Sequence, residues 1–247
     1  MTKRLNSNHL KMIAIIAMTL DHIADLISPV VQNIYLVSVL HIIGRLTAPI
    51  MFFFICEGFY YTKNLKKYIT RLFVFAFASH FAYCFAFGIN YLPFATGNLF
   101  NQTSIMWSLA FAVVALYVTN KTKLEKWKQV LIVILICVVT FSADWSCIAV
   151  MAILSMYSNR GNLKKQFMSM YFWITIYAVV SFLFVDRTYG IITLATALVY
   201  PLLKKYSGER GNAKWLKWFF YAYYPLHLFV IGVLRILMYG NVPLLFN

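Results

Sequence analysis

Nine apolar segments, separated by charged or turn-forming clusters, take up most of the chain. They cover residues 10–31, 35–61, 68–88, 104–119, 128–142, 145–157, 166–185, 189–203 and 216–239. A helix of about 20 apolar residues crosses a bilayer and satisfies its own backbone hydrogen bonds there. Segments 145–157 and 189–203 are short for a full crossing, so we expect them to be tilted or packed inside the bundle. The pattern predicts an all-α, polytopic membrane helix bundle with about nine transmembrane helices.

The composition excludes an ordinary soluble domain. Hydrophobic residues make up 62% of the 247 residues and charged residues only 12%, a balance that soluble domains of this length do not show. No linker or soluble domain interrupts the segments, so we expect residues 1–247 to form one integral membrane domain. The first segment carries internal charges and no small-residue cleavage signal, which predicts a retained span and not a signal peptide.

The basic residues alternate strictly with the predicted crossings. All but Arg45, Arg187 and Arg235 of the 22 Lys and Arg residues fall on one side of the bundle. They are Lys3, Arg4, Lys11, Lys63, Lys66, Lys67, Arg71, Lys121, Lys123, Lys126, Lys128, Arg160, Lys164, Lys165, Lys204, Lys205, Arg210, Lys214 and Lys217. Because short cytoplasmic loops are enriched in Lys and Arg, the pattern predicts a cytoplasmic N-terminus and an external C-terminus.

The net charge of +15 does not indicate nucleic-acid binding, because no soluble module with a basic face is visible. Topology explains most of this charge, although anionic headgroups and anionic soluble cofactors also concentrate at such a surface. The four cysteines, Cys56, Cys84, Cys137 and Cys147, fall in or beside apolar runs without CxxC spacing. We interpret them as small buried hydrophobic residues. No set of residues on one helix has metal-ligand spacing, so no metal is expected.

Asp21, His22 and Asp25 place three ionisable groups inside the first segment. Such groups are costly at mid-membrane and mark a functional site by default. At 1.5 Å per residue, His22 lies about 16 Å along the helix from Lys11, near mid-membrane. Asp25 shares a helix face with either neighbour. A carboxylate beside an imidazole fixes its tautomer and raises its basicity, so His22 is our candidate general base, oriented by Asp21 or Asp25.

The second segment carries Arg45 in its predicted outer half. The other interpretation of the aspartates is a structural ion pair between one of them and Arg45, and the two roles are compatible. Gly44 and Pro49 permit close helix approach and a kink. Glu57 lies within about two turns of the cytoplasmic end. For His41 we prefer an interfacial position to a role in the site.

Three further candidate residues lie in or between the later segments. His80 and His227 are lone histidines on aromatic-rich segments, which we interpret as hydrogen-bonded packing residues. Asp144 begins the sequence Asp-Trp-Ser at the tight outer connection between two segments. This pattern fits a turn with an interfacial Trp as well as a role at the outer mouth of a cavity.

Gly208, Arg210 and Gly211 lie in the last predicted cytoplasmic loop, just before the final aromatic-rich segment. Glycine lets backbone amides approach phosphates, and arginine binds phosphates bidentately. The same residues also form ordinary turns. The loop is therefore a candidate phosphate-binding element.

Several short motifs, in the same order along most of the chain, resemble the TraX family. They are 10–14 through Met18, Asp21-His22, Ile43-Gly44-Arg45 with Ala48-Pro49, Glu57-Gly58-Phe59 through Lys67-Tyr68, Arg71-Leu72, Gly208 with Arg210-Gly211, Phe220-Tyr221 and Tyr224-Pro225-Leu226-His227-Leu228. Residues 85–200 carry little of the resemblance. Ser207 and Glu209 stand where the family pattern leads us to expect Asn and Lys, which removes a positive charge from the loop.

The resemblance implies a membrane acetyltransferase of the bacterial inner membrane, related to the enzyme that acetylates the N-terminal amine of conjugative pilin. It implies acetyl-CoA as the donor and His22 as the central catalytic residue, with Arg45 as support. We expect the coenzyme A phosphates at Lys63, Lys67, Arg71, Gly208, Arg210 and Gly211. Glu57, Asp144, Tyr224 and His227 would bind the acceptor or support the site. The acceptor would be an amine, either a pilin-like peptide N-terminus or a cell-surface sugar or other amine.

A proton-coupled or small-molecule transporter is the competing function. In that interpretation Asp21, His22, Asp25, Arg45 and Glu57 line a proton or substrate pathway. The short segments favour it, and the absence of a paired inverted repeat in the sequence counts against it.

Overall fold

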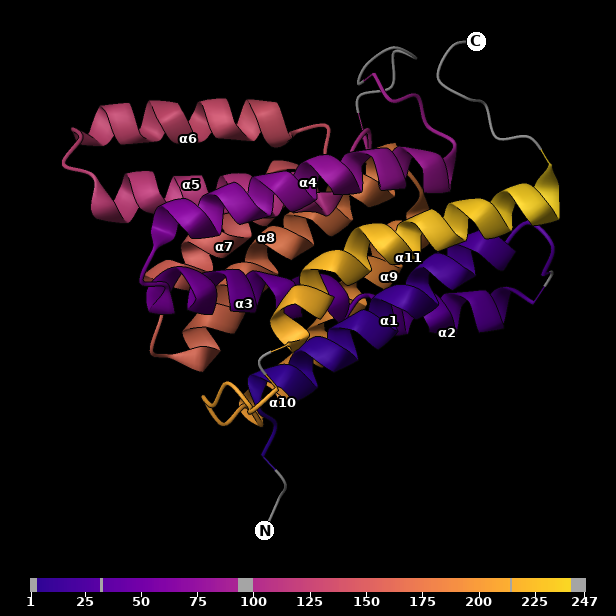
Figure 1. Cartoon of the computed structure of the whole chain (residues 1–247), viewed down its shortest axis with the longest axis horizontal. Helices are drawn as coiled ribbons and strands as arrows, with labels where there is room; N and C mark the ends of the chain where they lie inside the picture. The colour runs from indigo at the N-terminus through magenta and orange to yellow at the C-terminus, as the bar shows by residue number, and fades with distance from the viewer. Residues whose placement is uncertain (1–3, 32, 93–99, 214, 241–247) are drawn as a thin grey trace. The chain divides into compact units, whose positions relative to one another are not determined.

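A computed structural model describes residues 4–31, 33–92, 100–213 and 215–240, and all the regular elements in these ranges are helices (Figure 1). The helices are α1 (Ser7–Ile27), α2 (Ile34–Gly44), α3 (Thr47–Tyr61), α4 (Leu65–Phe87), α5 (Ile105–Lys121), α6 (Lys126–Thr140), α7 (Ser146–Ser158), α8 (Leu163–Phe184), α9 (Arg187–Thr193), the 3₁₀ helix η1 (Leu194–Leu198), α10 (Val199–Lys204) and α11 (Leu216–Tyr239). The all-α prediction is confirmed. Lys3 and Lys214, two of the predicted cytoplasmic residues, lie outside the described ranges.

Four helical stretches are long and apolar enough to cross a membrane. They are Ile34–Tyr61, Leu65–Phe87, Leu163–Phe184 and Trp218–Tyr239. Helix α1 has 21 residues but carries Lys11, Asp21 and Asp25, which lower its hydropathy. The chain therefore has the helices of a membrane protein, while nine crossings with the N-terminus inside and the C-terminus outside remain a prediction.

Two of the predicted segments are broken, and each break has a proline on its C-terminal side. The second segment divides into α2 and α3 at Arg45 and Leu46, four residues before Pro49. Because proline has no N–H, the carbonyl of Arg45 has no helical donor, which accounts for an interruption at the place where the sequence predicts a kink. The eighth segment divides into α9, η1 and α10, and Pro201 likewise leaves the carbonyl of Ala197 without a helical donor.

The chain divides into two compact units whose boundaries fall within α3, α7 and α11. The first unit comprises Met1–Phe54 and Ser155–Tyr223, and the second comprises Ile55–Leu154 and Tyr224–Asn247. A single domain over residues 1–247 stays a prediction.

In the first unit, α1 and α2 pack as an antiparallel pair, and α8 packs against α9. Thr47 at the start of α3 donates a hydrogen bond of 3.1 Å to the carbonyl of Ala14 on α1. Between α8 and α9, a Cβ added at Gly190 would meet the Ala178 carbonyl at 2.7 Å. A glycine therefore permits the close approach of α9 to α8.

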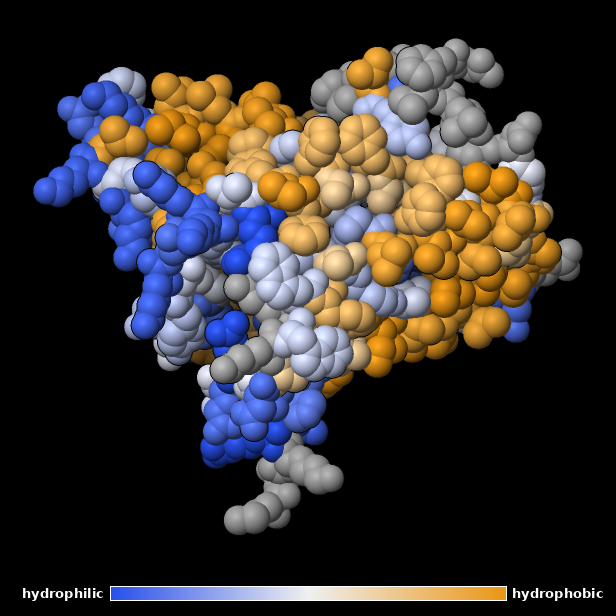
Figure 2. Space-filling view, in the orientation of Figure 1, coloured by the Kyte–Doolittle hydropathy of each residue, from blue (hydrophilic) through white to orange (hydrophobic). Residues whose placement is uncertain are grey.

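In the second unit, α5 lies at the centre, between α4 and α6. Its Ala110, Ala112, Val113, Ala115 and Leu116 are fully buried. The outer surface of the unit is strongly apolar, as the C-terminal part of α11 shows in Figure 2, and Phe229 and Leu237 are among its exposed side chains. Exposed aliphatic and aromatic side chains of this kind are stable against lipid and not against water.

Candidate functional site

Asp21 and Arg45 form an ion pair in the first unit, between α1 and the end of α2. Nη2 of Arg45 lies 2.7 Å from Oδ2 and 2.9 Å from Oδ1 of Asp21. The Arg45 side chain is 6% exposed and that of Asp21 17% exposed. This confirms that one aspartate pairs with Arg45 and identifies it as Asp21. An arginine so buried is stable only with such a partner.

Gly44 makes the pairing possible because it lets α2 approach α1. A Cβ placed on Gly44 would lie 2.4 Å from the carboxyl carbon of Asp21. The neighbouring Arg45 caps the C-terminus of α2. The close approach predicted for Gly44 therefore occurs at the carboxylate that Arg45 binds.

His41 joins this pair, which the sequence analysis did not predict. Its Nδ1 lies 2.8 Å from Oδ1 of Asp21, and its Nε2 lies 3.8 Å from Oδ1 of Asp25. His41 and Arg45 are four residues apart on α2, so they share a helix face. The i,i+4 spacing of His41 and Arg45 was the only sequence signal that they act together. It does not show which face of α2 meets α1.

His22 lies beside Asp25. Nδ1 of His22 is 3.5 Å from Oδ2 of Asp25, which is within ion-pair range but longer than an ordinary hydrogen bond. The His22 side chain is 13% exposed, whereas that of Asp25 is 42% exposed. Of the two aspartates proposed to orient His22, Asp25 lies within ion-pair distance of its ring, while Asp21 binds Arg45 and His41.

Tyr189 covers the other side of Arg45. Its ring centre lies 5.0 Å from the guanidinium carbon, a cation–π distance. Asp186 caps α9 by accepting a 2.7 Å hydrogen bond from the backbone N–H of Tyr189, which fixes the start of this short helix. No sequence pattern links Tyr189 to Arg45, because the contact depends on how α9 packs against α2.

The five side chains on α1 and α2 form a row of alternating charge and imidazole: Arg45, Asp21, His41, Asp25 and His22. Arg45 balances the charge of Asp21, and each histidine lies beside at least one carboxylate. Carboxylate–imidazole contacts of this kind hold and move protons. Within the described residues, no three His, Cys, Asp or Glu side chains are placed to share a metal ion.

Further along α1, toward its N-terminus, aromatic residues of the first unit surround the polar side chains. The hydroxyl groups of Thr19 and Tyr223 are 2.7 Å apart. Nζ of Lys11 lies 4.9 Å from the ring centre of Phe54 and 5.5 Å from that of Phe220. This face of α1 therefore continues from the ionisable cluster to a lysine at the predicted cytoplasmic end.

The loop that carries Gly208, Arg210 and Gly211, here called the glycine loop, packs against the first turn of α1. The backbone N–H of Ser7 donates to the carbonyl of Glu209 at 2.8 Å, and the Ser7 hydroxyl donates to that of Arg210 at 2.6 Å. Gly211 has φ +78°, and an added Cβ there would meet the side-chain nitrogen of Asn8 at 2.7 Å. Gly208, with φ +79°, faces open space, and the Arg210 side chain is exposed. In Figure 2 this end of the first unit is hydrophilic.

The remaining residues predicted to bind phosphate belong to the second unit. Asn64 caps α4 by accepting a 2.9 Å hydrogen bond from the backbone N–H of Lys67. Lys63 and Lys67 are exposed, and the Arg71 guanidinium lies 5.7 Å from the ring centre of Tyr68. Glu57, also in this unit, is half-buried in the last turns of α3. The predicted donor-binding residues are thus divided between the two units.

Asp144, Tyr224 and His227 also lie in the second unit. The backbone N–H of Asp144 donates to the carbonyl of Thr103 at 2.8 Å. Tyr224 and His227 are both 7% exposed, with ring centres 5.4 Å apart. They pack as neighbours three residues apart on α11, so two of the four predicted supporting residues are in contact.

Two other sequence interpretations are tested in the same unit. Trp145, considered as an interfacial residue, is only 5% exposed and therefore packs inside the protein. His80 is a packing residue as predicted. One of its ring nitrogens lies 2.9 Å from the Thr103 hydroxyl, and the other lies 2.8 Å from the Tyr91 carbonyl.

Comparison with known proteins extends the resemblance to almost the whole chain. The sequence model described as TraX protein matches residues 6–235. The chain is also 27% identical over 231 residues to a probable fimbrial assembly protein, FimC of serogroup H1, from Dichelobacter nodosus. That alignment covers 89% of this chain and 91% of the relative. The comparison with solved structures gives no match. Because the family match includes both units and every residue of the ionisable cluster, the chain belongs to the TraX family.

Proposed function

We propose that this protein transfers an acetyl group from cytoplasmic acetyl-CoA to an amine, and that His22 is the general base. The observation that carries the proposal is the pairing of His22 with Asp25 beside the neutralised Asp21–Arg45 pair, at 3.5 Å and 2.7 Å. This arrangement leaves one carboxylate to orient the imidazole while the other is held by arginine. Family membership supports the choice of acetyl transfer over other uses of a buried histidine.

The proposed reaction is a direct acyl transfer. With Nδ1 of His22 turned to Asp25, Nε2 accepts a proton from the attacking amine. The amine nitrogen bonds to the thioester carbonyl carbon and the C–S bond breaks. The proton then passes to the leaving thiolate, which gives the amide and free coenzyme A. His22 as a transient acetyl carrier is the covalent version of the same role.

The donor would approach from the glycine-loop end of α1. The exposed Arg210 side chain, Gly208 and Gly211 would contact its phosphates there. Lys63, Lys67 and Arg71 of the second unit remain separate candidates for phosphate binding. Arg45 would keep Asp21 ionised and hold His41 in place. Its Nη2 is already engaged by Asp21, which favours this role over polarising the thioester carbonyl.

The acceptor would be an amine at or beyond the outer face of a bacterial inner membrane. The fimbrial assembly protein among the relatives favours a pilin-like peptide N-terminus over a cell-surface sugar. Asp144, Tyr224 and His227 are the proposed acceptor-side residues, and Glu57 a supporting one.

A transporter is the second candidate, and the broken helices of the first unit favour it. Interruptions such as Arg45–Leu46 and η1 occur in transporters where unwound backbone lines a substrate pathway. In that function the same carboxylates and histidines would carry protons.

Transfer from radiolabelled acetyl-CoA to a pilin-like peptide, with a sugar amine in parallel, tests the proposal. We expect His22→Ala to lower the rate at least about 100-fold, because general-base catalysis contributes about 10²–10⁴-fold. The transfer rate of Asp25→Asn should lie between the rates of His22→Ala and wild type. Ile16→Ala is the matched control, since Ile16 lies on the same helix and is 56% exposed.

Two results would overturn the proposal. One is the absence of coenzyme A binding and label transfer in folded protein. The other is proton-driven uptake into proteoliposomes that depends on Asp21, which would establish the transporter instead.

A further inference from the structure

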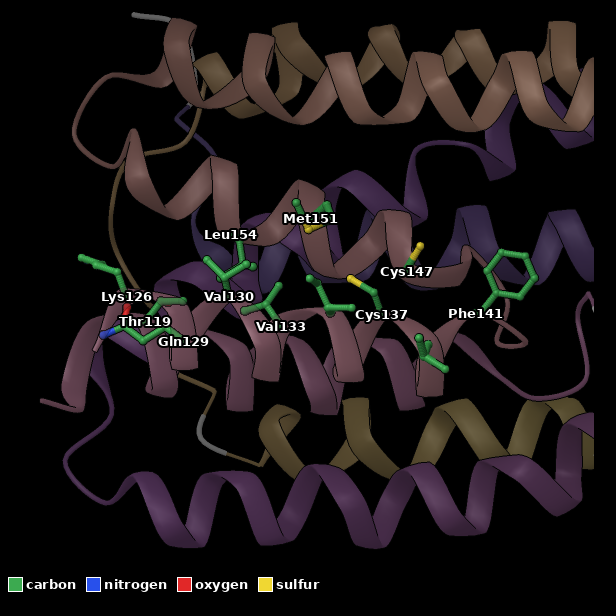
Figure 3. Close-up of a pocket in the computed structure, with 12 residues that line it drawn as sticks. Thr119, Lys126, Gln129, Val130, Val133, Cys137, Phe141, Cys147, Met151 and Leu154 are labelled. Atoms are coloured by element: carbon green, nitrogen blue, oxygen red, sulfur yellow. The ribbon is translucent and has the colours of Figure 1, made fainter. Parts of the chain in front are cut away.

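An apolar groove of about 940 Å³ runs along the second unit between α6 and α7, with its end at the last turn of α5 (Figure 3). Thr119, Lys126 and Gln129 lie at one end of the groove and Phe141 at the other. Cys137 and Cys147 also line it. Both are partly exposed, so the prediction that all four cysteines are buried is wrong for these two.

The walls of the groove are aliphatic along its length. Val130, Ile134 and Val138 follow one another by a turn of α6 and are each more than half exposed. Met151 and Leu154 line the opposite wall on α7. This lining excludes a water-soluble polar ligand and suits a hydrocarbon chain, which has no hydrogen bonds to lose.

The mouth of the groove is basic. Lys126 is the first residue of α6, where the helix dipole adds further positive potential. Its neighbour Lys128 is paired with Glu125 at 3.0 Å, whereas Lys126 has no ion pair within the described part of the chain. Lys121 and Lys123 add exposed positive charge nearby. Trp127, 63% exposed, is the kind of side chain found at a membrane interface.

From this combination we propose that the groove binds one phospholipid with an anionic headgroup. The phosphate and headgroup lie at Lys126, and one acyl chain lies along Val130, Ile134 and Val138 toward Phe141. From Lys126 to Phe141 α6 rises about 22 Å, which fits within a hydrocarbon core of about 30 Å. The acyl chain of a zwitterionic lipid fits the apolar walls equally well, but its headgroup has no net charge to neutralise Lys126. Basic pockets between membrane helices bind anionic headgroups in this way.

Native mass spectrometry of the full-length protein in detergent tests the proposal. The protein is incubated with equal amounts of phosphatidylglycerol and phosphatidylcholine that have identical acyl chains. We expect one phosphatidylglycerol to be retained at least fivefold over phosphatidylcholine. Lys126→Glu should abolish this preference, while Lys123→Glu, the same charge change outside the groove, should retain most of it.

A second pair of variants tests the walls. Val133→Trp fills the groove and should remove the bound lipid, whereas Leu131→Trp adds the same side chain to the exposed face of α6 outside the groove. Equal retention of the two lipids, equal loss in both lysine variants, or retention in Val133→Trp would each overturn the proposal. Circular dichroism shows whether each variant is folded.

Discussion

Arg45 has the most demanding environment of the ionisable residues in the first unit. Its side chain is 6% exposed, its carboxylate partner is Asp21, and Tyr189 covers its other side. A buried ion pair adds little stability by itself, but removing one member leaves an uncompensated charge in a medium of low dielectric constant. Asp25 differs, because its carboxylate is 42% exposed.

This contrast predicts different effects for two isosteric substitutions. Asp21→Asn should lower the free energy of unfolding by about 3–5 kcal/mol, because Arg45 loses its counter-charge. Asp25→Asn, the matched control, should cost about 1 kcal/mol or less. Denaturation of the purified protein by sodium dodecyl sulfate, followed by circular dichroism, measures both.

A double variant shows whether the lost stability of Asp21→Asn comes from the unpaired charge of Arg45. Adding Arg45→Met to Asp21→Asn should restore most of the lost stability, since it removes the unpaired cation. If Asp21→Asn and Asp25→Asn were equally destabilising, Arg45 would not depend on Asp21.

At the scale of the helix, the site depends on how closely α2 approaches α1. Gly44, the last residue of α2, supplies the small surface at this contact, and Pro49 leaves the carbonyl of the next residue, Arg45, without a helical donor. The two residues together place the Arg45 side chain at the Asp21 carboxylate. The residues that hold α2 and α1 together therefore also set the geometry around His41.

Gly44→Ala tests this dependence. The added methyl group would lie 2.4 Å from the Asp21 carboxyl carbon, so the helices must separate, and we expect a loss of about 1–3 kcal/mol. Acetyl transfer should fall as well, because His41 and Arg45 move with α2. Val39→Ala on the exposed face of α2 is the control, with an expected change within about 0.5 kcal/mol. Wild-type stability in Gly44→Ala would show that the contact is not tight.

At the scale of the whole molecule, the number of membrane crossings depends on the length and polarity of the helices. The four long apolar stretches have the length and composition needed to cross a membrane. The predicted nine crossings also require α1, α5, α6, α7 and the broken segment from α9 to α10. The polar groups of α1 and of the broken segment are stable in a membrane only if neighbouring helices shelter them. The distribution of basic residues predicts that the N-terminus, the loop 206–214 and Lys126 lie on the cytoplasmic side.

Cysteine labelling in intact cells tests this topology. In a variant without Cys56, Cys84, Cys137 and Cys147, single cysteines replace the exposed residues Lys66, Lys123, Lys204 or Arg187. We expect a membrane-impermeant maleimide to label Arg187→Cys in intact cells, and the other three only after permeabilisation. Labelling of Lys204→Cys from outside would refute the predicted cytoplasmic side of the glycine loop.

The sequence by itself determined the helical class and the position of the ionisable group on α1. Apolar runs that must satisfy their backbone hydrogen bonds internally have few alternatives to helices, and Asp21, His22 and Asp25 are adjacent in the chain. Pro49 and Gly44 also fixed a kink and a close contact, because their effects on the backbone are local.

Only the tertiary structure decided which residues meet. Arg45 pairs with Asp21, His41 contacts the same carboxylate, and the Tyr189 ring lies against Arg45. All three contacts depend on how the packed helices are rotated and how far apart they lie. A membrane helix presents apolar side chains on every face, so its sequence pattern carries little information about which face meets a neighbour. Packing settles that choice, and with it which carboxylate is left for His22.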